Sequence, residues 1–164
     1  MAEDVVEVLN AYLGALARCV FAEMGVLDKF LGDGLMAIFG LVEDHYDGAA
    51  PAARAALAMR RGIERLNEER AARGEPPIGF GVGVHTGEVV VGAIGLPERS
   101  DYTAIGDIVN TASRLQGLCK QFKVDAVLSE ETGARLKDAG FDVRELGAAT
   151  VQGKAQPLRV WTLA

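Results

Sequence analysis

Segments of helical periodicity alternate with pairs of short apolar runs along this chain. Apolar residues recur at helical spacing over residues 4–24, which predicts an amphipathic helix that ends at Gly25. Two short apolar runs follow, 26–31 and 35–39. They flank Gly32-Asp33-Gly34, a combination typical of a β-hairpin with a tight turn.

The same alternation continues downstream. Residues 49–73 form the longest predicted helix, and the runs 78–84 and 88–94 predict a second hairpin around His85-Thr86-Gly87. The remaining expectations are a helix over 108–121 with Asp107 as its N-cap, strands near 124–128, 141–146 and 158–163, and a short helix near 130–138. This order is neither a clean βαβ alternation nor all-β. We therefore expect an α+β fold, with helices packed against a mixed sheet.

Composition favours one globular domain. The length of 164 residues suits a single core, and 49% apolar with 24% charged residues argues against long disorder. The net charge of −6 argues against a nucleic-acid-binding surface, which needs a dense basic face. Cys19 and Cys119 each lie in a predicted helix among apolar neighbours, so we expect two buried thiols rather than a disulfide.

The N-terminus carries no basic region followed by an apolar run, which argues against a signal peptide. No stretch of about 18 apolar residues is free of charge, so we expect no membrane span. A reducing, cytoplasmic location is the expectation that follows.

A first polar cluster surrounds the turn of the first predicted hairpin. Lys29 and Asp33 bracket the end of a strand and the turn. A carboxylate in a glycine-flanked turn is able to approach a metal bound to phosphates, and Mg²⁺ prefers one or two carboxylates plus phosphate oxygens. For this segment alone, a solvated hairpin turn is the alternative, since Asp-Gly is common there.

A second polar cluster lies around the start of the helix predicted over 108–121. Asn110 and Arg114 are four residues apart and project from one helix face. Asparagine suits a sugar, and arginine suits a phosphate or the charge that develops on it. Thr103 precedes the helix in extended structure, where it is placed to read a base edge. A solvated helix face is the alternative for this segment alone.

A glycine-punctuated stretch over 81–92 has the look of a phosphate loop. A phosphate loop needs a helix N-terminus or a nest of amides, and no helix follows this stretch. We therefore reject that interpretation and expect His85 to be structural rather than a general base.

Taken together, these segments resemble the catalytic domain of the class III adenylate and guanylate cyclases of bacterial type. The resemblance covers nearly the whole chain and is carried by residues 27–40, 83–92 and 101–115 and by Gly153-Lys154. It implies a ferredoxin-like α/β sandwich of the nucleotidyl cyclase type with a mostly antiparallel sheet. It also implies a single catalytic domain over residues 1–164.

The resemblance implies a role for each matching position. Lys29 and Thr103 match the pair that reads the purine, and a lysine with a threonine is similar to the pair that selects adenine. Lysine meets the N1 acceptor of adenine, and threonine accepts from its amino group. Asp33 matches a metal-binding aspartate, Asn110 the residue that orients the ribose, and Arg114 the arginine that stabilises the transition state.

The implied activity is that of an adenylate cyclase, in which the ribose 3′-oxygen of ATP attacks the α-phosphorus and pyrophosphate leaves. Two Mg²⁺ or Mn²⁺ ions per site would lower the pKa of the 3′-hydroxyl and clamp the phosphates. The implied site is shared across a homodimer, so a monomer would be inactive. Relatives usually carry an upstream sensor or receptor domain.

The start of the chain departs from the family pattern. The family's first strand carries the other metal aspartate and a phosphate-holding loop, but Met1 to Asp4 is too short and too polar to be that strand. We thus expect an N-terminally incomplete domain with one of two metal aspartates. Truncation, an inactive relic and strand exchange in the dimer remain open as explanations. A relic would be a nucleotide-binding or dimerisation module rather than an enzyme.

Two smaller departures concern phosphate contacts. Gly81 stands where many relatives have an arginine, and Gln152 stands where relatives often have a lysine that meets phosphates. Lys154, two residues further on, is the candidate substitute for that lysine.

Overall fold

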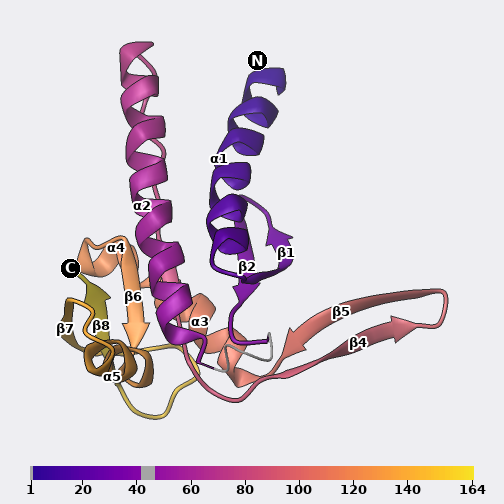
Figure 1. Ribbon diagram of the computed structural model, residues 1–164, viewed down its shortest axis with the longest axis vertical. Coiled ribbons are helices and arrows are strands. Elements are labelled where there is room, and N and C mark those ends of the chain that lie inside the picture. The colour runs from indigo at the N-terminus through magenta and orange to yellow at the C-terminus, as the bar shows by residue number, and fades with distance from the viewer. Residues whose placement is uncertain (1, 42–46) are drawn as a thin grey trace. The chain divides into compact units, whose positions relative to one another are not determined.

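In this computed structural model the chain is described over residues 2–41 and 47–164, with side chains over 5–41, 47–98 and 103–164. The contacts within the chain divide it into two compact units, residues 1–80 and 81–164 (Figure 1).

The first unit is two helices with a hairpin between them in sequence. It contains α1 (Ala2–Ala22), β1 (Val26–Leu31), β2 (Gly34–Ile38) and α2 (Ala49–Ala72). The predicted helices and the first predicted hairpin are confirmed, with ends that differ by up to two residues. β1 and β2 pair antiparallel with each other, and their register shifts between Leu27 and Lys29.

The two helices of this unit pack through small side chains. Along α2 the buried face is mostly alanine, which lets the axis of α1 come close, and Val20 of α1 is fully buried. Arg54 of α2 donates from Nε to Glu23 at 2.7 Å, just beyond the end of α1. Glycine is needed at Gly25, because a Cβ added there would lie 2.5 Å from Cε1 of Phe39.

One stretch of α1 departs from expectation. Val5–Ala22 is long and apolar enough to cross a membrane by length and composition. A core helix of a soluble protein and a signal sequence meet the same two criteria, so this stretch alone does not indicate a membrane span.

The second unit holds a four-stranded sheet, a separate hairpin and three helices. The sheet has the order β3-β6-β8-β7, with β3 parallel to β6 and the other neighbours antiparallel. The elements are β3 (Val82–Val84), β4 (Val90–Leu96), β5 (Arg99–Ile105), α3 (Asp107–Gly117), α4 (Cys119–Phe122), β6 (Ala126–Ser129), α5 (Glu130–Asp138), β7 (Val143–Ala149) and β8 (Leu158–Leu163).

The core of this unit lies between α3 and the sheet. Leu115, Val127 and Val160 are fully buried there and pack together with Val151. Gly83 lets β3 approach the helix, because an added Cβ would overlap the backbone of α3. The mixed α+β architecture predicted from the sequence is confirmed.

Three expectations for this unit are wrong. The predicted second hairpin does not form, because β3 pairs in parallel with β6 and β4 pairs with β5. The strand β5 was not predicted, because the segment 99–105 begins with polar residues and lacks a clear apolar pattern. Asp107 is not the N-cap. Gly106 is, with no side-chain cap bond, and Asp107 is the first helical residue. The helix predicted over 108–121 is interrupted, since α3 ends at Gly117 and α4 begins at Cys119.

Other predictions for single elements and for the cysteines agree with the structure. The short helix over 130–138 and the strand over 158–163 are confirmed, and the strand expected near 141–146 runs to Ala149. Both cysteines are free thiols, as expected. Cys119 is buried, but Cys19 is only half-buried.

Candidate functional site

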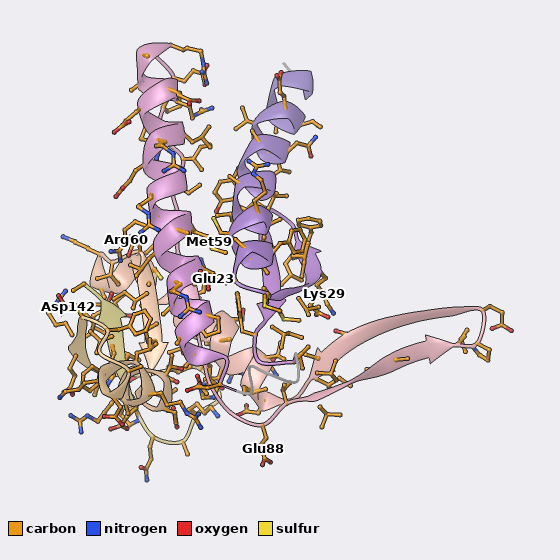
Figure 2. All side chains as sticks on the ribbon, in the orientation of Figure 1. Glu23, Lys29, Met59, Arg60, Glu88 and Asp142 are labelled. Carbon is orange, nitrogen blue, oxygen red and sulfur yellow. The ribbon has the colours of Figure 1, made fainter. Side chains whose placement is uncertain are left out.

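Lys29 and Asp33 lie in the first unit, on the β1–β2 hairpin. Lys29 is in β1, opposite Met36 in the register, and Figure 2 labels its side chain. Asp33 is exposed in the turn, beside Gly32 at φ +62. The geometry of this turn thus presents a carboxylate to solvent on a backbone that glycine allows to bend sharply.

A second carboxylate lies next to Lys29. The Asp28 side chain is only 3% exposed, and its Oδ2 is 3.5 Å from Nζ of Lys29, whose own side chain is 42% exposed. Burial raises the pKa of the Tyr12 hydroxyl, and the negative charge of Asp33 adds to that rise. The hairpin therefore combines one exposed cation with an exposed and a buried carboxylate.

The side chains near the hairpin turn fit a metal ion only if it takes few of its ligands from the protein. Within 2–41 and 47–164, no group of three or more His, Cys, Asp or Glu side chains gathers. Mg²⁺ at nucleotide sites commonly uses one or two carboxylates and takes its other ligands from phosphates and water. The exposed Asp33 fits that chemistry as a single protein ligand.

Asn110 and Arg114 lie in the second unit, on α3. Asp107 shares their face, because positions i, i+3 and i+7 of a helix project together. The adjacent side of the helix carries Thr111 and Leu115, both buried in the core. The amphipathic pattern therefore fixes which way the polar face of α3 points.

Arg114 lies against the connection between β7 and β8. A Cβ added at Gly153, which has φ +77, would lie 3.0 Å from Nη2 of Arg114 and 3.3 Å from Nη1. In the same connection, Nζ of Lys154 donates to Oδ2 of Asp107. This hydrogen bond, and then the nearby positive charges, hold the pKa of Asp107 below its usual value.

Thr103 lies on β5, opposite Gly92 of β4. Its side chain is half-buried, and its hydroxyl makes a long contact of 3.5 Å with the Ala104 carbonyl. It precedes α3 by four residues, as the sequence indicated.

His85 follows β3 and has a polar environment of its own. Its Nδ1 is buried without a hydrogen bond and lies 3.9 Å from Oε2 of Glu131. Burial lowers the pKa of His85, although the Glu131 charge opposes that shift. Next to it, the Thr86 hydroxyl bonds that of Thr132 at 2.8 Å, which in turn bonds Ser129 at 3.0 Å. The structural role expected for His85 remains a prediction.

The two sequence departures have different surroundings. Gly81 is tightly enclosed: an added Cβ would lie 3.2 Å from Cβ of Cys119 and from Nε2 of Gln116, so an arginine here would displace its neighbours. Gln152 is exposed, one residue before the glycine that faces Arg114.

The second unit thus brings Asn110, Arg114 and Lys154 to one face of α3, and the first unit places Lys29 and Asp33 on one hairpin. Sequence reasoning missed Asp107 and Gly153 as part of this arrangement. Their partners lie 47 and 39 residues away, and the only local signal was an acidic residue at a helix start, which suggested a cap.

The sequence of the chain matches a known protein family and curated relatives. Residues 1–164 match the family model of the adenylate and guanylate cyclase catalytic domain. The chain is 35% identical over 159 residues to "Adenylate cyclase 1" of Rhizobium meliloti, covering 97% of this chain and 24% of that protein. It spans about a quarter to a third of the length of two of its curated relatives and 8% of the length of another.

Two solved structures share the fold over the whole chain. The adenylyl cyclase CyaB from P. aeruginosa has a TM-score of 0.89 at 30% identity, covering 100% of this chain and 84% of that one. The guanylyl cyclase Cya2 has a TM-score of 0.84 at 31% identity, covering 100% of this chain and 82% of that one. Overall likeness therefore does not separate the two nucleotide specificities.

Proposed function

The chain belongs to the adenylate and guanylate cyclase catalytic domain family, and from this premise we propose that it converts ATP to 3′,5′-cyclic AMP and pyrophosphate. The observation that carries the proposal is the polar face of α3, where Asn110 and Arg114 project together and Arg114 is backed by Gly153. An arginine and an asparagine held on one rigid face suit a ribose and a reacting phosphate.

The adenine preference rests on two side chains. Lys29 would donate to N1 of adenine, and the Thr103 hydroxyl would accept from the exocyclic amino group. Guanine presents a donor at N1 and a carbonyl oxygen in place of the amino group, so the same pair would leave those groups badly matched. Support comes from the chemistry of these two residues, since solved relatives of both specificities share the fold at 30% and 31% identity.

Positioning and charge stabilisation account for most of the proposed rate. Asn110 orients the ribose so that its 3′-oxygen faces the α-phosphorus, and the bond to pyrophosphate breaks as the new one forms. Arg114 donates to the phosphoryl oxygens, on which negative charge increases. Asp33 would hold a Mg²⁺ or Mn²⁺ ion, which lowers the pKa of the 3′-hydroxyl and binds phosphate oxygens when present.

A homodimer with shared sites is part of the proposal. The β4–β5 hairpin reaches away from the sheet of its own unit (Figure 1), and three apolar side chains of β4 are exposed: Val90 is 70%, Ile94 46% and Leu96 69% exposed. Exposed apolar ribbons of this kind mark protein–protein contacts. A second copy is the occupant that we propose, with Asp33 from one copy completing a site with Lys29, Thr103, Asn110 and Arg114 from the other.

The cellular setting is also proposed rather than observed. Cyclic nucleotide synthesis implies a signalling role in the cytoplasm, where ATP is abundant. Because the chain matches only a part of its longer relatives, a sensor or receptor domain upstream would supply the regulatory input.

The direct test is formation of cyclic AMP from ATP with Mn²⁺ or Mg²⁺. We expect product from the chain, none from Asp33→Asn, and a lower yield of cyclic GMP from GTP. ATP binding in calorimetry with no cyclic product would contradict catalysis and favour the nucleotide-binding or dimerisation module instead.

A further inference from the structure

The connection between β7 and β8 is fixed to the rest of the second unit at two points. At its start, Val151 is buried in the core and accepts a hydrogen bond of 3.1 Å from the Lys154 amide, which closes a turn. At the tip of that turn, Nζ of Lys154 donates to Asp107, the first residue of α3. The loop is thus held at its start by a buried side chain and at its tip by an ion pair with Asp107, whose side chain is 67% exposed.

Arg114 lies under this loop. It is two helical turns after Asp107 on the same face, and the backbone of Gly153 takes the space beside its guanidinium. Any side chain at position 153 would press on Nη1 and Nη2 of Arg114. The loop thus covers one side of the guanidinium with backbone alone.

The charges in this arrangement support the contacts. Asp107 interacts with two cations, since the Lys154 hydrogen bond and the Arg114 charge both lower its pKa. Asp107 therefore carries a negative charge on the face of α3 at which both Lys154 and Arg114 lie, and it accepts a hydrogen bond directly from Lys154.

We propose that Lys154, Asp107 and Gly153 form a clasp that positions the Arg114 guanidinium for the reacting phosphate. The catalytic part of this inference rests on the proposed function. Lys154 and Asp107 are then positioning residues, and Lys154 acts through Asp107 rather than by meeting substrate phosphates itself.

The kinetic test uses Asp107→Asn, Lys154→Met and the double variant. Because the clasp acts as a unit, each variant should lower kcat about tenfold or more at nearly unchanged KM, and the double variant should be no worse than the singles. A lysine that binds phosphates directly predicts the opposite. Lys154→Met would then raise KM in both backgrounds, and Asp107→Asn would lower it by freeing the lysine, which would overturn the clasp.

Glycine variants separate the contact from backbone strain. Gly153→Ala places a Cβ against Arg114, whereas Gly140, at φ +82, has nothing within 4 Å of an added Cβ. Both substitutions strain a left-handed backbone, but only Gly153→Ala should lower kcat. Equal losses from the two would contradict a role for Gly153 in placing the guanidinium.

A spectroscopic test does not depend on turnover. The Nε–Hε resonance of Arg114, assigned with Arg114→Lys, should move in Asp107→Asn, Lys154→Met and Gly153→Ala. It should stay in place in Gly140→Ala and in Glu145→Gln, which removes an exposed pair with Arg159 at 2.5 Å in the same unit. An unmoved resonance in the first three variants would overturn the clasp. A moved resonance in a chain that makes no cyclic AMP would support the clasp and contradict the proposed function.

Discussion

The polar face of α3 and the β1–β2 hairpin carry different parts of the candidate site, and they are built differently. On α3, Arg114 projects from a helix whose other face is buried against the sheet of its unit, with Leu115 fully buried. On the hairpin, Lys29 and Asp33 lie on a two-stranded ribbon, and neighbouring Phe30 and Leu31 are each 54% exposed. A buried core therefore supports Arg114, whereas Lys29 and Asp33 lie on a two-stranded ribbon whose neighbouring apolar side chains are exposed.

The two regions need different precision in the placement of their functional side chains. A two-stranded hairpin alone is marginal in water, while a helix packed on a sheet has a defined position. Stabilising the charge that develops on a phosphate demands donors that are already in place. Base reading and metal binding tolerate a more adjustable support, because the nucleotide itself supplies further contacts.

The largest effect is expected at Arg114. Arg114→Ala should lower turnover about 10²-fold or more and leave ATP binding nearly unchanged, because the contact strengthens mainly in the transition state. Steady-state kinetics and calorimetry measure the two quantities, with the exposed Arg144→Ala as the control. Equal losses in binding and turnover would show that Arg114 only holds the substrate.

Lys29 on the hairpin, together with Thr103 on β5, should instead govern which base is accepted. Lys29→Glu with Thr103→Cys should lower the ATP-over-GTP ratio of kcat/KM by about 10–100-fold, the size expected for lost hydrogen bonds to a charged group. Lys120→Glu, an exposed charge reversal on α4, is the control. An unchanged ratio would mean that these two residues do not read the base.

Glycine substitutions compare the packing of the two regions. Gly83→Ala should lower the free energy of unfolding by about 1–3 kcal/mol, since the new Cβ would overlap the backbone of α3. Gly34→Ala in the hairpin should cost less, because the nearest atom to its Cβ, the Leu31 carbonyl oxygen, is 3.6 Å away. Denaturant titration measures both, and equal costs would remove the contrast in packing.

The smallest effect concerns pH. Burial lowers the pKa of His85 in the folded state, so the unfolded state binds the proton more tightly, and stability should fall as pH drops through the unfolded pKa of about 6.5. His85→Asn cannot titrate, so its stability should fall less than that of the parent between pH 7.5 and pH 5.5. Parallel pH profiles from thermal unfolding would contradict this assignment.

Local sequence patterns predicted the helices and strands well where a strand pairs with the next strand in the sequence. Helical periodicity located α1, α2 and α5, and the turn Gly32-Asp33-Gly34 located the first hairpin. The second predicted hairpin failed because β3 has the same short apolar pattern whether it pairs with β4 or, across a helix, with β6. Periodicity gives the face of a strand but not its partner.

The candidate site shows the same limit. Spacing placed Asn110 and Arg114 on one helix face, which the structure also has. It did not connect Lys154 to Asp107, because that contact depends on the route of the β7–β8 connection over α3. Local rules predict a cap for Asp107 at a helix start, whereas in the structure its carboxylate accepts a hydrogen bond from Lys154.

The central claim is that the hairpin and the α3 face serve one catalytic site that two copies complete. Its most direct test mixes Asp33→Asn with Arg114→Ala, each inactive alone, and measures cyclic AMP formed from ATP. Random pairing makes half of the dimers mixed with one intact site of two, so about a quarter of the parent activity should return. A mixture as inactive as its components, beside an active parent chain, would contradict the claim.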